Sequence, residues 1–258
     1  MNNRYPSLFI SHGAPDIAIS QHAAADALKA LGRRFPQPAA IVIVSAHWVS
    51  EPVGITAVEA PETIHDFGGF PEALYRLQYP AKGDPQLAEA IASRLQNAGF
   101  DIDLERRRGL DHGAWMPLFL MYPEANIPVV QVALPAGGLQ HCVRLGKALA
   151  PLRDAGVLLI GSGGSVHNLR ALNREQSTAP WAGAFEEWLL QAVEGNHCDW
   201  LVEPARFPVD FNTAHPTIEH YLPLIFACAA GGEDSPGRRI HHSFMYGNIG
   251  MSCFEFGN

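Results

Sequence analysis

Short hydrophobic runs alternate along the chain with segments whose apolar residues recur at helical spacing. The runs are nearly continuous and are closed by Gly, Ser or Pro, which is typical of buried strands. They cover Ser7–Ser11, Ala40–Ser45, Gly54–Val58, Val129–Leu134 and Val157–Gly161. This alternation predicts an α/β fold with a central mixed, partly parallel sheet flanked by helices.

Helix signals lie between these runs. One helix is predicted to begin at Asp84-Pro85, an N-cap followed by a first-turn proline, and to end at Gly99. Further helices are predicted at 141–155 and 181–194. We expect segment 242–254 to form one or two strands that close a sheet edge, and the irregular segment 196–216 to cover a functional site.

The composition fits one globular unit. The chain has 258 residues, 47% of them hydrophobic and 17% charged, and no internal repeat, so we expect a single catalytic domain over 1–258. The net charge of -8, with no basic run longer than Arg106-Arg107-Arg108, argues against a nucleic-acid partner. No signal-like N-terminus and no apolar stretch of about 20 residues occurs, so we expect no membrane segment.

The cysteines suggest neither a disulfide framework nor a thiolate zinc site. They are widely spaced and contain no C-x-x-C pair: Cys142, Cys198, Cys228 and Cys253. We therefore expect a reduced, cytoplasmic protein.

Four histidines lie where an apolar run meets a turn: His12, His47, His167 and His220. Because strand ends gather functional groups in α/β proteins, the pattern predicts imidazoles that converge on one metal ion. Each histidine also has an ordinary interpretation, as a turn residue bonded to the backbone or, for His220, as a residue at a helix start.

The glycines of Gly161-Ser162-Gly163-Gly164-Ser165 lack G-x-G-x-x-G spacing and the lysine of a P-loop, so we do not expect a nucleotide site. We expect this turn to let the backbone approach a ligand and to direct His167 toward it.

Two further histidines are candidates for the same site. His112 lies in a predicted loop after Asp111, where it could donate a hydrogen bond or carry a proton. His65, in a loop of glycines and aromatic residues, could line the substrate pocket. Five other histidines are expected to be structural or on the surface: His22, His141, His197, His241 and His242.

Taken together, these segments resemble the DOPA-type extradiol ring-cleavage dioxygenases, a branch of the class III (protocatechuate 4,5-dioxygenase-like) superfamily. Six motifs occur in the same order over most of the chain. They are Phe9-Ile10-Ser11-His12-Gly13-Ala14-Pro15, Val44-Ser45-Ala46-His47-Trp48, Thr63-Ile64-His65-Asp66-Phe67-Gly68-Gly69-Phe70-Pro71, Asp111-His112-Gly113-Ala114-Trp115, Val166-His167-Asn168-Leu169 and Glu219-His220-Tyr221-Leu222-Pro223.

The resemblance implies that His12, His47 and His220 bind one non-heme divalent metal. It also implies that His167 lies beside the metal, as an acid and base or as a fourth ligand, and that His112 faces the substrate. Many relatives use a carboxylate as the third ligand, and Glu219 precedes His220 here. DOPA-type members carry histidine at that place, so we assign His220.

The implied reaction opens a catechol such as DOPA with O2 as co-substrate, using Fe(II) for turnover, with Zn(II) a plausible occupant of the same ligands. Aromatic residues could form an apolar wall against the ring: Trp48, Phe67, Phe70 and Trp115. Arg170 could meet a substrate carboxylate or form a surface ion pair. A zinc-dependent hydrolase and a non-catalytic metal-binding protein remain alternatives, and the sequence leaves the oligomeric state open.

Overall fold

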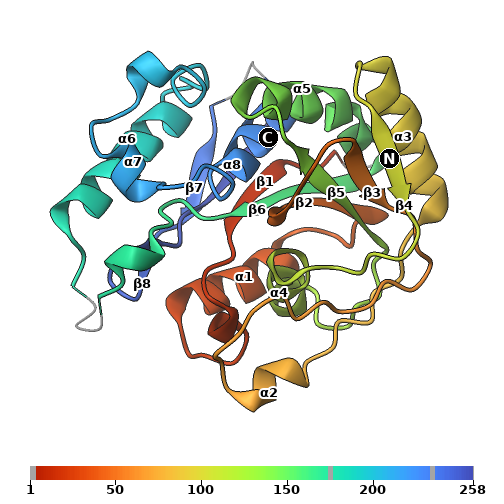
Figure 1. Cartoon of the computed structure of the whole chain (residues 1–258), viewed down its shortest axis with the longest axis horizontal. Coiled ribbons are helices and arrows are strands. Elements are labelled where there is room, and N and C mark those ends of the chain that lie inside the picture. The colour runs from red at the N-terminus through yellow and green to blue at the C-terminus, as the bar shows by residue number, and fades with distance from the viewer. Residues whose placement is uncertain (1–3, 174–176, 233–235, 258) are drawn as a thin grey trace.

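The computed structural model describes residues 4–173, 177–232 and 236–257. Its main feature is one eight-stranded sheet in the order β4-β3-β5-β2-β6-β1-β10-β7 (Figure 1). These strands are β1 (Ser7–Ser11), β2 (Ala40–Ser50), β3 (Val53–Thr56), β4 (Ile102–Glu105), β5 (Val129–Pro135), β6 (Val157–Gly163), β7 (Arg238–His241) and β10 (Cys253–Phe256). A separate hairpin pairs β8 (Phe244–Met245) with β9 (Ile249–Gly250).

The centre of the sheet is parallel and its flanks contain antiparallel pairs. β5, β2, β6 and β1 run parallel to one another in that order. β10 lies antiparallel between β1 and β7, and β3 joins β5 in the antiparallel sense. The predicted mixed, partly parallel sheet is confirmed. The sheet edge beside β10 is β7, which the sequence analysis did not predict.

Side chains of the central strands alternate between two buried clusters, one on each face of the sheet. In β2, Ile41 and Ile43 face one cluster, and Val42 and Val44 face the other. The first cluster includes residues of α1 (Ala23–Arg34) and α4 (His112–Met121). The second includes residues of α3 (Pro85–Asn97), α5 (Leu139–Leu149), α6 (Pro180–Glu194) and α8 (Leu222–Gly231). Helices therefore cover both faces, as Figure 1 shows for α1 and α4 below the sheet and α3 and α5 above it.

The remaining helical elements are short. They are α2 (Glu72–Tyr75), α7 (Phe211–Ala214) and the 3-10 turns η1 (Pro15–Ala18), η2 (Ala150–Ala155), η3 (Leu169–Ala171) and η4 (Pro204–Arg206). The helix predicted at 141–155 is divided into α5 and η2. Pro151 accounts for this division, because a proline has no backbone N–H to continue the α-helical hydrogen bonds.

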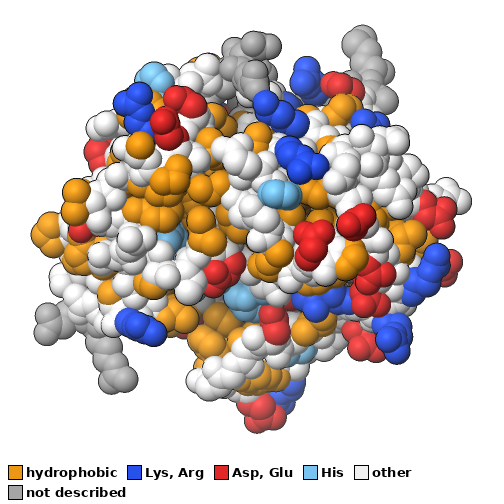
Figure 2. Space-filling model, turned by 45° about the horizontal axis from the view of Figure 1, so that its top comes forward, with side chains coloured by type: hydrophobic (Ala, Val, Ile, Leu, Met, Phe, Trp, Pro, Cys, Tyr) orange, Lys and Arg blue, Asp and Glu red, His pale blue; other side chains and the backbone are white. Residues whose placement is uncertain are grey.

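The surface in Figure 2 carries Lys and Arg side chains interspersed with Asp and Glu, and histidine side chains are visible between hydrophobic ones. Within the described ranges, no helix is long and apolar enough to cross a membrane.

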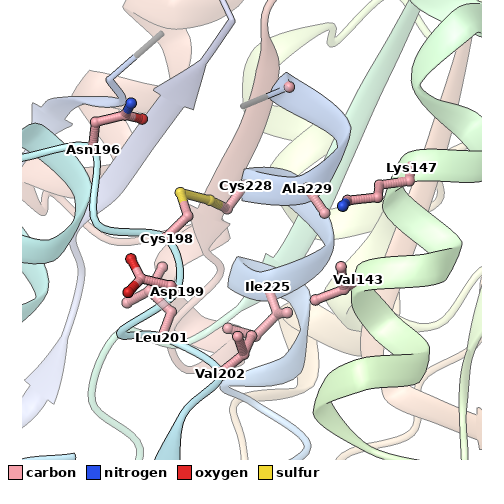
Figure 3. Close-up of a pocket in the computed structure, with 11 residues that line it drawn as sticks. Val143, Lys147, Asn196, Cys198, Asp199, Leu201, Val202, Ile225, Cys228 and Ala229 are labelled. Atoms are coloured by element: carbon pink, nitrogen blue, oxygen red, sulfur yellow. A yellow bond between two sulfur atoms is a disulfide. The ribbon is translucent and has the colours of Figure 1, made fainter. Parts of the chain in front are cut away.

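One prediction about the cysteines is wrong. Cys198 and Cys228, which are 30 residues apart in sequence, form a disulfide with their Cα atoms 6.7 Å apart. The bond fastens the segment after α6 to α8, beside a cavity of about 300 Å³ (Figure 3). Sequence spacing does not reveal the pairing, because the fold brings the two residues together. Cys142 and Cys253 are free and buried.

Candidate functional site

His12 follows the carboxyl end of β1 and is held by a hydrogen-bond chain. The Ser162 hydroxyl donates to the Gly113 carbonyl oxygen at 2.5 Å, so its oxygen accepts from His12 Nδ1 at 2.9 Å. This assignment leaves His12 Nε2 unprotonated and directed to His47, whose Nε2 lies 3.1 Å away. A histidine oriented through one ring nitrogen presents the other nitrogen for coordination.

His47 lies inside β2 rather than at its end. The pairing of β2 with β6 stops at Ser45, and the register with β5 shifts between Val44 and Val49. His47 therefore occupies an irregular stretch beyond the regular part of the sheet. Such irregularities can redirect a side chain, and here the ring approaches that of His12.

His220 reaches the site because glycines let its segment pack directly on β6. A Cβ atom added to Gly163 would lie 2.2 Å from the His220 carbonyl oxygen, and one added to Gly161 would lie 2.1 Å from that of Pro223. Both glycines belong to β6, so the predicted turn over 161–165 begins later than expected. The close approach that they permit is to the start of α8, not to a ligand.

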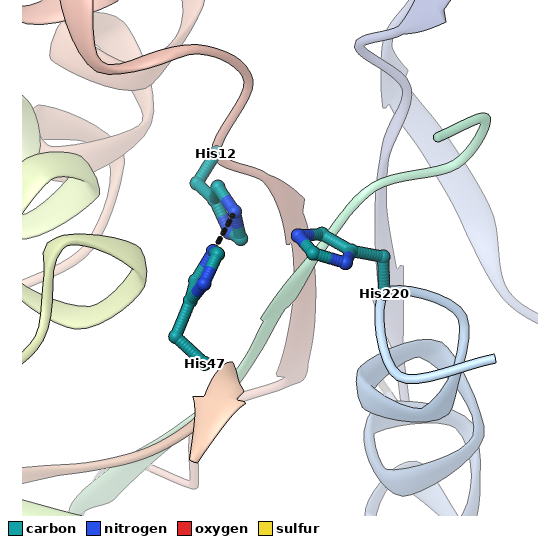
Figure 4. A group of neighbouring side chains, drawn as sticks. All are labelled: His12, His47 and His220. Carbon is teal, nitrogen blue, oxygen red and sulfur yellow. Dashed lines mark hydrogen bonds between the residues drawn. The ribbon is translucent and has the colours of Figure 1, made fainter. Parts of the chain in front are cut away.

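The three imidazoles converge in space, as Figure 4 shows. One ring nitrogen from each of His12, His47 and His220 lies within 4.8 Å of the others. Burial, followed by the neighbouring imidazoles, lowers the pKa of His12 and His220 well below the usual value and that of His47 to about 3. Neutral imidazole is the form that binds iron or zinc.

The donor set fits a metal ion. Both ring nitrogens of His220 are buried and lack a hydrogen-bond partner among the described residues. This is costly for a polar group unless another species satisfies it. His12 Nε2 and His47 Nε2 lie 3.1 Å apart, so both nitrogens could reach one cation. These residues could therefore hold one divalent cation.

His167 lies beside this group. Its ring stacks on that of His220 with centroids 3.4 Å apart and planes 5° apart, and its backbone N–H donates to the Ala214 carbonyl oxygen at 2.9 Å. Burial is the main cause that lowers the pKa of His167 to about 4, against the opposing charge of Glu219. The structure thus places a neutral, half-buried imidazole next to the three-histidine group.

His112 is the first residue of α4, not a loop residue as predicted. Asp111 caps the helix by accepting from the Ala114 N–H at 3.1 Å. The Asp66 carboxylate accepts from both Nδ1 and the backbone N–H of His112, at 2.8 and 2.9 Å. Burial raises the pKa of Asp66, but these hydrogen bonds and the charge of His112 outweigh it and lower the pKa to about 2. His47, Asp66 and His112 form a second group of possible ligands that shares His47 with the first.

A single cavity of about 850 Å³ connects these histidines with an apolar wall. Its histidines are His12, His47, His112, His167 and His220. The other lining residues are Gly13, Ala14, Pro15, Phe67, Gly69, Phe70, Leu169, Leu172, Asn173, Tyr246 and Ile249. Two predicted wall residues, Phe67 and Phe70, are therefore at the cavity.

Other predicted substrate contacts lie elsewhere. His65 Nε2 donates to the Leu77 carbonyl oxygen at 3.0 Å, and Trp48 packs under the Arg108 guanidinium 4.5 Å from the ring centroid. Trp115 is buried in the core, and Arg170 is exposed on η3. None of these four side chains is among the described residues that line the cavity, and their contact with substrate stays a prediction.

Segment 196–216 does not cover the cavity. Within the described chain, its residues are absent from the cavity wall, and α7 packs near α6 instead. The segment contacts the chain just before His167, through His215. His215, a buried residue for which the sequence pattern predicts no role, donates from Nε2 to the Ser165 carbonyl oxygen at 3.0 Å.

Sequence reasoning also missed Gly113. A Cβ atom there would lie 2.4 Å from Ser45 Oγ, 2.9 Å from His47 Cδ2 and 3.2 Å from His12 Cε1. The glycine lets the first turn of α4 approach the two histidines. Its position next to His112 in the motif was the only available signal.

Comparisons with known proteins agree with this geometry. The model of the family described as the catalytic LigB subunit of aromatic ring-opening dioxygenase matches residues 6–257. The 4,5-DOPA dioxygenase extradiol of Beta vulgaris is 38% identical over 262 residues, covering 99% of this chain and 97% of that protein. The protein of the same name from Escherichia coli strain K12 is 38% identical over 267 residues, covering 99% and 96%.

A solved structure has the same overall fold. The crystal structure of an uncharacterized protein from Escherichia coli K12 matches with a TM-score of 0.81 and 32% identity, covering 98% of this chain and 100% of that one. Both the family model and the two dioxygenases named above match nearly the whole chain. The chain therefore belongs to the LigB family of aromatic ring-opening dioxygenases.

Proposed function

We propose that this protein is an extradiol dioxygenase that opens a catechol such as DOPA with O2 and one divalent metal. One observation carries the proposal: three neutral imidazoles converge on a large cavity in a chain of the LigB family. The relatives named 4,5-DOPA dioxygenase extradiol support the substrate class.

In this proposal His12, His47 and His220 hold the metal. Ferrous iron held there would bind the catechol and activate O2, whereas zinc at the same ligands is redox-inert. We therefore assign Fe(II) to turnover. A metal held by three protein ligands would have room to bind substrate as well.

His167 is the proposed acid and base. Its neutral imidazole can accept a proton from a catechol hydroxyl, and the negative charge of the resulting catecholate favours the protonated ring. The same ring can then return the proton to an oxygen of the product. Its position against His220 places it at the edge of the metal group.

His112 is the proposed partner of the substrate oxygens. Asp66 accepts the Nδ1 proton, which fixes the ring and leaves Nε2 as the nitrogen available to the cavity. Phe67 and Phe70 line the same cavity and would exclude water from the ring.

Reconstitution tests the proposal directly. The metal-free protein is loaded with Fe(II) under anaerobic conditions, metal content is measured, and catechols are added with O2. We expect O2 uptake and a yellow semialdehyde, whose mass shows that both oxygen atoms were incorporated. If iron-loaded protein of confirmed occupancy consumes no O2 with any catechol, the proposal is wrong.

A zinc-loaded sample tests the hydrolase alternative. Hydrolysis of test esters by the zinc-loaded protein, together with no oxygenase activity of the iron-loaded protein, would favour a hydrolase. The cytoplasmic location also stays a prediction, and cell fractionation tests it.

A further inference from the structure

The histidine cavity is larger than a catechol ring requires. Its volume is about 850 Å³, near the upper end of the roughly 300–1,000 Å³ that is typical of cavities for small ligands. Beyond the histidines, its wall includes Tyr246 and the segment Gly13-Ala14-Pro15. Because catechol is one aromatic ring with two hydroxyl groups, a group attached to that ring has room to contact these wall residues.

Tyr246 brings a hydroxyl group to this part of the wall. The residue lies between β8 and β9, and its side chain is half-buried. Its hydroxyl donates to the Asp16 carboxylate, and Asp16 directly follows Pro15 of the cavity wall. The side chain therefore crosses from its own loop to the segment after β1, beside the cavity.

The backbone of Tyr246 is fixed in an unusual conformation. Its φ angle is 50°, in the left-handed region that residues other than glycine rarely adopt. Its carbonyl oxygen accepts from the backbone N–H groups of Asn173 and Asn248, at 2.9 and 3.0 Å. Such conformations persist where the surrounding structure determines them, and they cluster at ligand sites. The hydroxyl is therefore held at a defined place in the wall.

The bond to Asp16 decides what the Tyr246 hydroxyl can bind. A phenol has one proton to donate, and its oxygen can also accept. Burial, followed by the hydrogen bond to Asp16 and the charge of Asp16, raises the pKa of Tyr246 to about 12. The proton therefore stays in this bond at neutral pH, and Tyr246 Oη offers a further partner lone pairs rather than a proton.

The charge of Asp16 makes a cation the preferred partner. A hydrogen bond from a charged donor is roughly twice as strong as one between neutral groups. An ammonium group at Tyr246 Oη would also be attracted by the carboxylate on the other side of the hydroxyl, whereas an anion there would be repelled. The face of the tyrosine ring attracts cations as well.

We infer that Tyr246, polarised by Asp16, accepts a hydrogen bond from a protonated amino group on the substituent of the catechol and so selects amine-bearing catechols. The inference rests on the proposed ring-opening function and assigns a specificity-determining residue to it. DOPA, the proposed substrate, carries such an amino group. Asp16 acts through Tyr246 and is a positioning residue.

Two catechols with side chains of equal length test the inference. 3,4-Dihydroxyphenethylamine carries a protonated amine where 4-propylcatechol carries a methyl group. We expect the iron-loaded enzyme to open the amine with a kcat/KM about tenfold or more above that of 4-propylcatechol. The difference should lie mainly in KM, because the amino group is bound alike in the ground state and the transition state.

Two variants connect this preference to the pair of residues. Tyr246→Phe removes the hydroxyl oxygen and keeps the ring. Asp16→Asn keeps an oxygen that accepts from the Tyr246 hydroxyl and removes the charge. Each should lower the ratio of kcat/KM for the amine to kcat/KM for 4-propylcatechol by about tenfold. A merely structural role would change both substrates by the same factor and leave the ratio unchanged.

Asp26→Asn is the matched control. It removes one negative charge from an exposed carboxylate of α1 that pairs with Lys29 at 3.3 Å, so it changes the net charge as Asp16→Asn does and should keep the ratio. Calorimetric titration of the zinc-loaded protein, which cannot turn the compounds over, gives the ratio of their dissociation constants. The same variants should lower the binding preference for the amine.

The outcomes separate this inference from the function on which it rests. An unmodified enzyme that does not prefer the amine, or a ratio that Asp16→Asn leaves unchanged, overturns the inference while ring opening stands. If Tyr246→Phe does not fold, Asp16→Asn alone decides. Failure of the iron-loaded enzyme to open any catechol overturns the proposed function, and the titrations of the zinc-loaded protein still test the amine preference.

Discussion

The imidazole of His167 lies parallel to that of His220, with ring centroids 3.4 Å apart and 5° between the ring planes. The lone pairs of ring nitrogens lie in the ring plane. Because the two ring planes are parallel and lie one above the other, their lone pairs point in parallel planes and do not meet at one metal position. Of these two histidines, His220 belongs to the group of nitrogens within 4.8 Å of one another and His167 does not, among the residues that the structure describes. The geometry therefore favours His167 as an acid and base over a fourth ligand.

We predict that His167→Ala retains metal and loses turnover. Loss of a general acid and base typically lowers kcat by about 10²–10⁴-fold, whereas the three ligands would remain. Metal content after dialysis and kcat of the iron-loaded protein are the two measurements.

His12→Ala provides the comparison, because it removes a member of the ligand group and should lower metal content itself. If His167→Ala loses metal as completely as His12→Ala, His167 is a ligand and the stacking argument is wrong.

Asp66→Asn should impair turnover by releasing the ring of His112. The carboxylate accepts from His112 Nδ1 at 2.8 Å, and its pKa of about 2 keeps it charged at neutral pH. We expect a loss of roughly ten- to hundredfold in kcat/KM, as is usual when a group that orients a functional histidine is removed. Glu72→Gln, which removes an exposed carboxylate paired with Arg76, is the control. Equal kcat/KM in both variants would exclude the role of Asp66.

The strands and helices that the sequence pattern predicts differ in burial from those that it does not predict. β1, β5 and β6 are buried on both faces and are continuous apolar runs, so their patterns were readable. β4 and β7 are short flanking strands with charged side chains, and they resemble loops in sequence. α4 is buried almost all round, so it has no polar face to give a helical period.

The site shows the same division. His12 and His47 were recognisable because each follows a strand-like run. The partners Asp66 and His215 were not, because their contacts are made between distant segments: Asp66 lies 46 residues from His112, and His215 lies 50 residues from Ser165. The sequence pattern indicates which histidines are candidate metal ligands, but it does not indicate which side chains orient those histidines.

Gly113→Ala should disturb the histidine pair. The new methyl group would lie 2.4 Å from Ser45 Oγ and 2.9 Å from His47 Cδ2, both closer than normal contact. We expect a loss of stability of about 1–3 kcal/mol, typical of overpacking, together with weaker metal binding. Thermal unfolding of the metal-free protein and a metal titration separate the two effects.

Gly183→Ala in α6 is the matched control, because no atom of another described part of the chain lies within 4 Å of the added methyl group. It should be neutral or slightly stabilising, as alanine favours a helix over glycine by about 1 kcal/mol. Similar metal affinity in the two variants would show that the close approach of α4 is unimportant.

The Cys198–Cys228 disulfide should stabilise the fold without contributing to the metal group. A bond that joins residues 30 positions apart is worth about 3–4 kcal/mol in the loop-entropy description. The double variant Cys198→Ser and Cys228→Ser should therefore unfold at lower temperature and still bind metal. Thiol titration of denatured, unreduced protein should find only Cys142 and Cys253; detection of all four thiols would contradict the pairing.

His215 should make the metal-free fold sensitive to acid. Burial is the main cause that lowers its pKa to about 3, whereas in the unfolded chain the value is near 6.5. Between these pH values the unfolded state binds one more proton at His215 than the folded state does. The stability that neutral His215 contributes is therefore present above about pH 6.5 and is lost as the pH falls toward 3, by up to about 1.4 kcal/mol per pH unit.

His215→Gln keeps an N–H donor that can reach the Ser165 carbonyl oxygen but does not titrate. Its free energy of unfolding, measured in urea between pH 7 and pH 5, should fall less steeply than that of the unmodified protein. His197→Gln changes an exposed histidine and serves as the control. Parallel slopes for His215→Gln and the unmodified protein would rule out His215 as a source of the acid sensitivity.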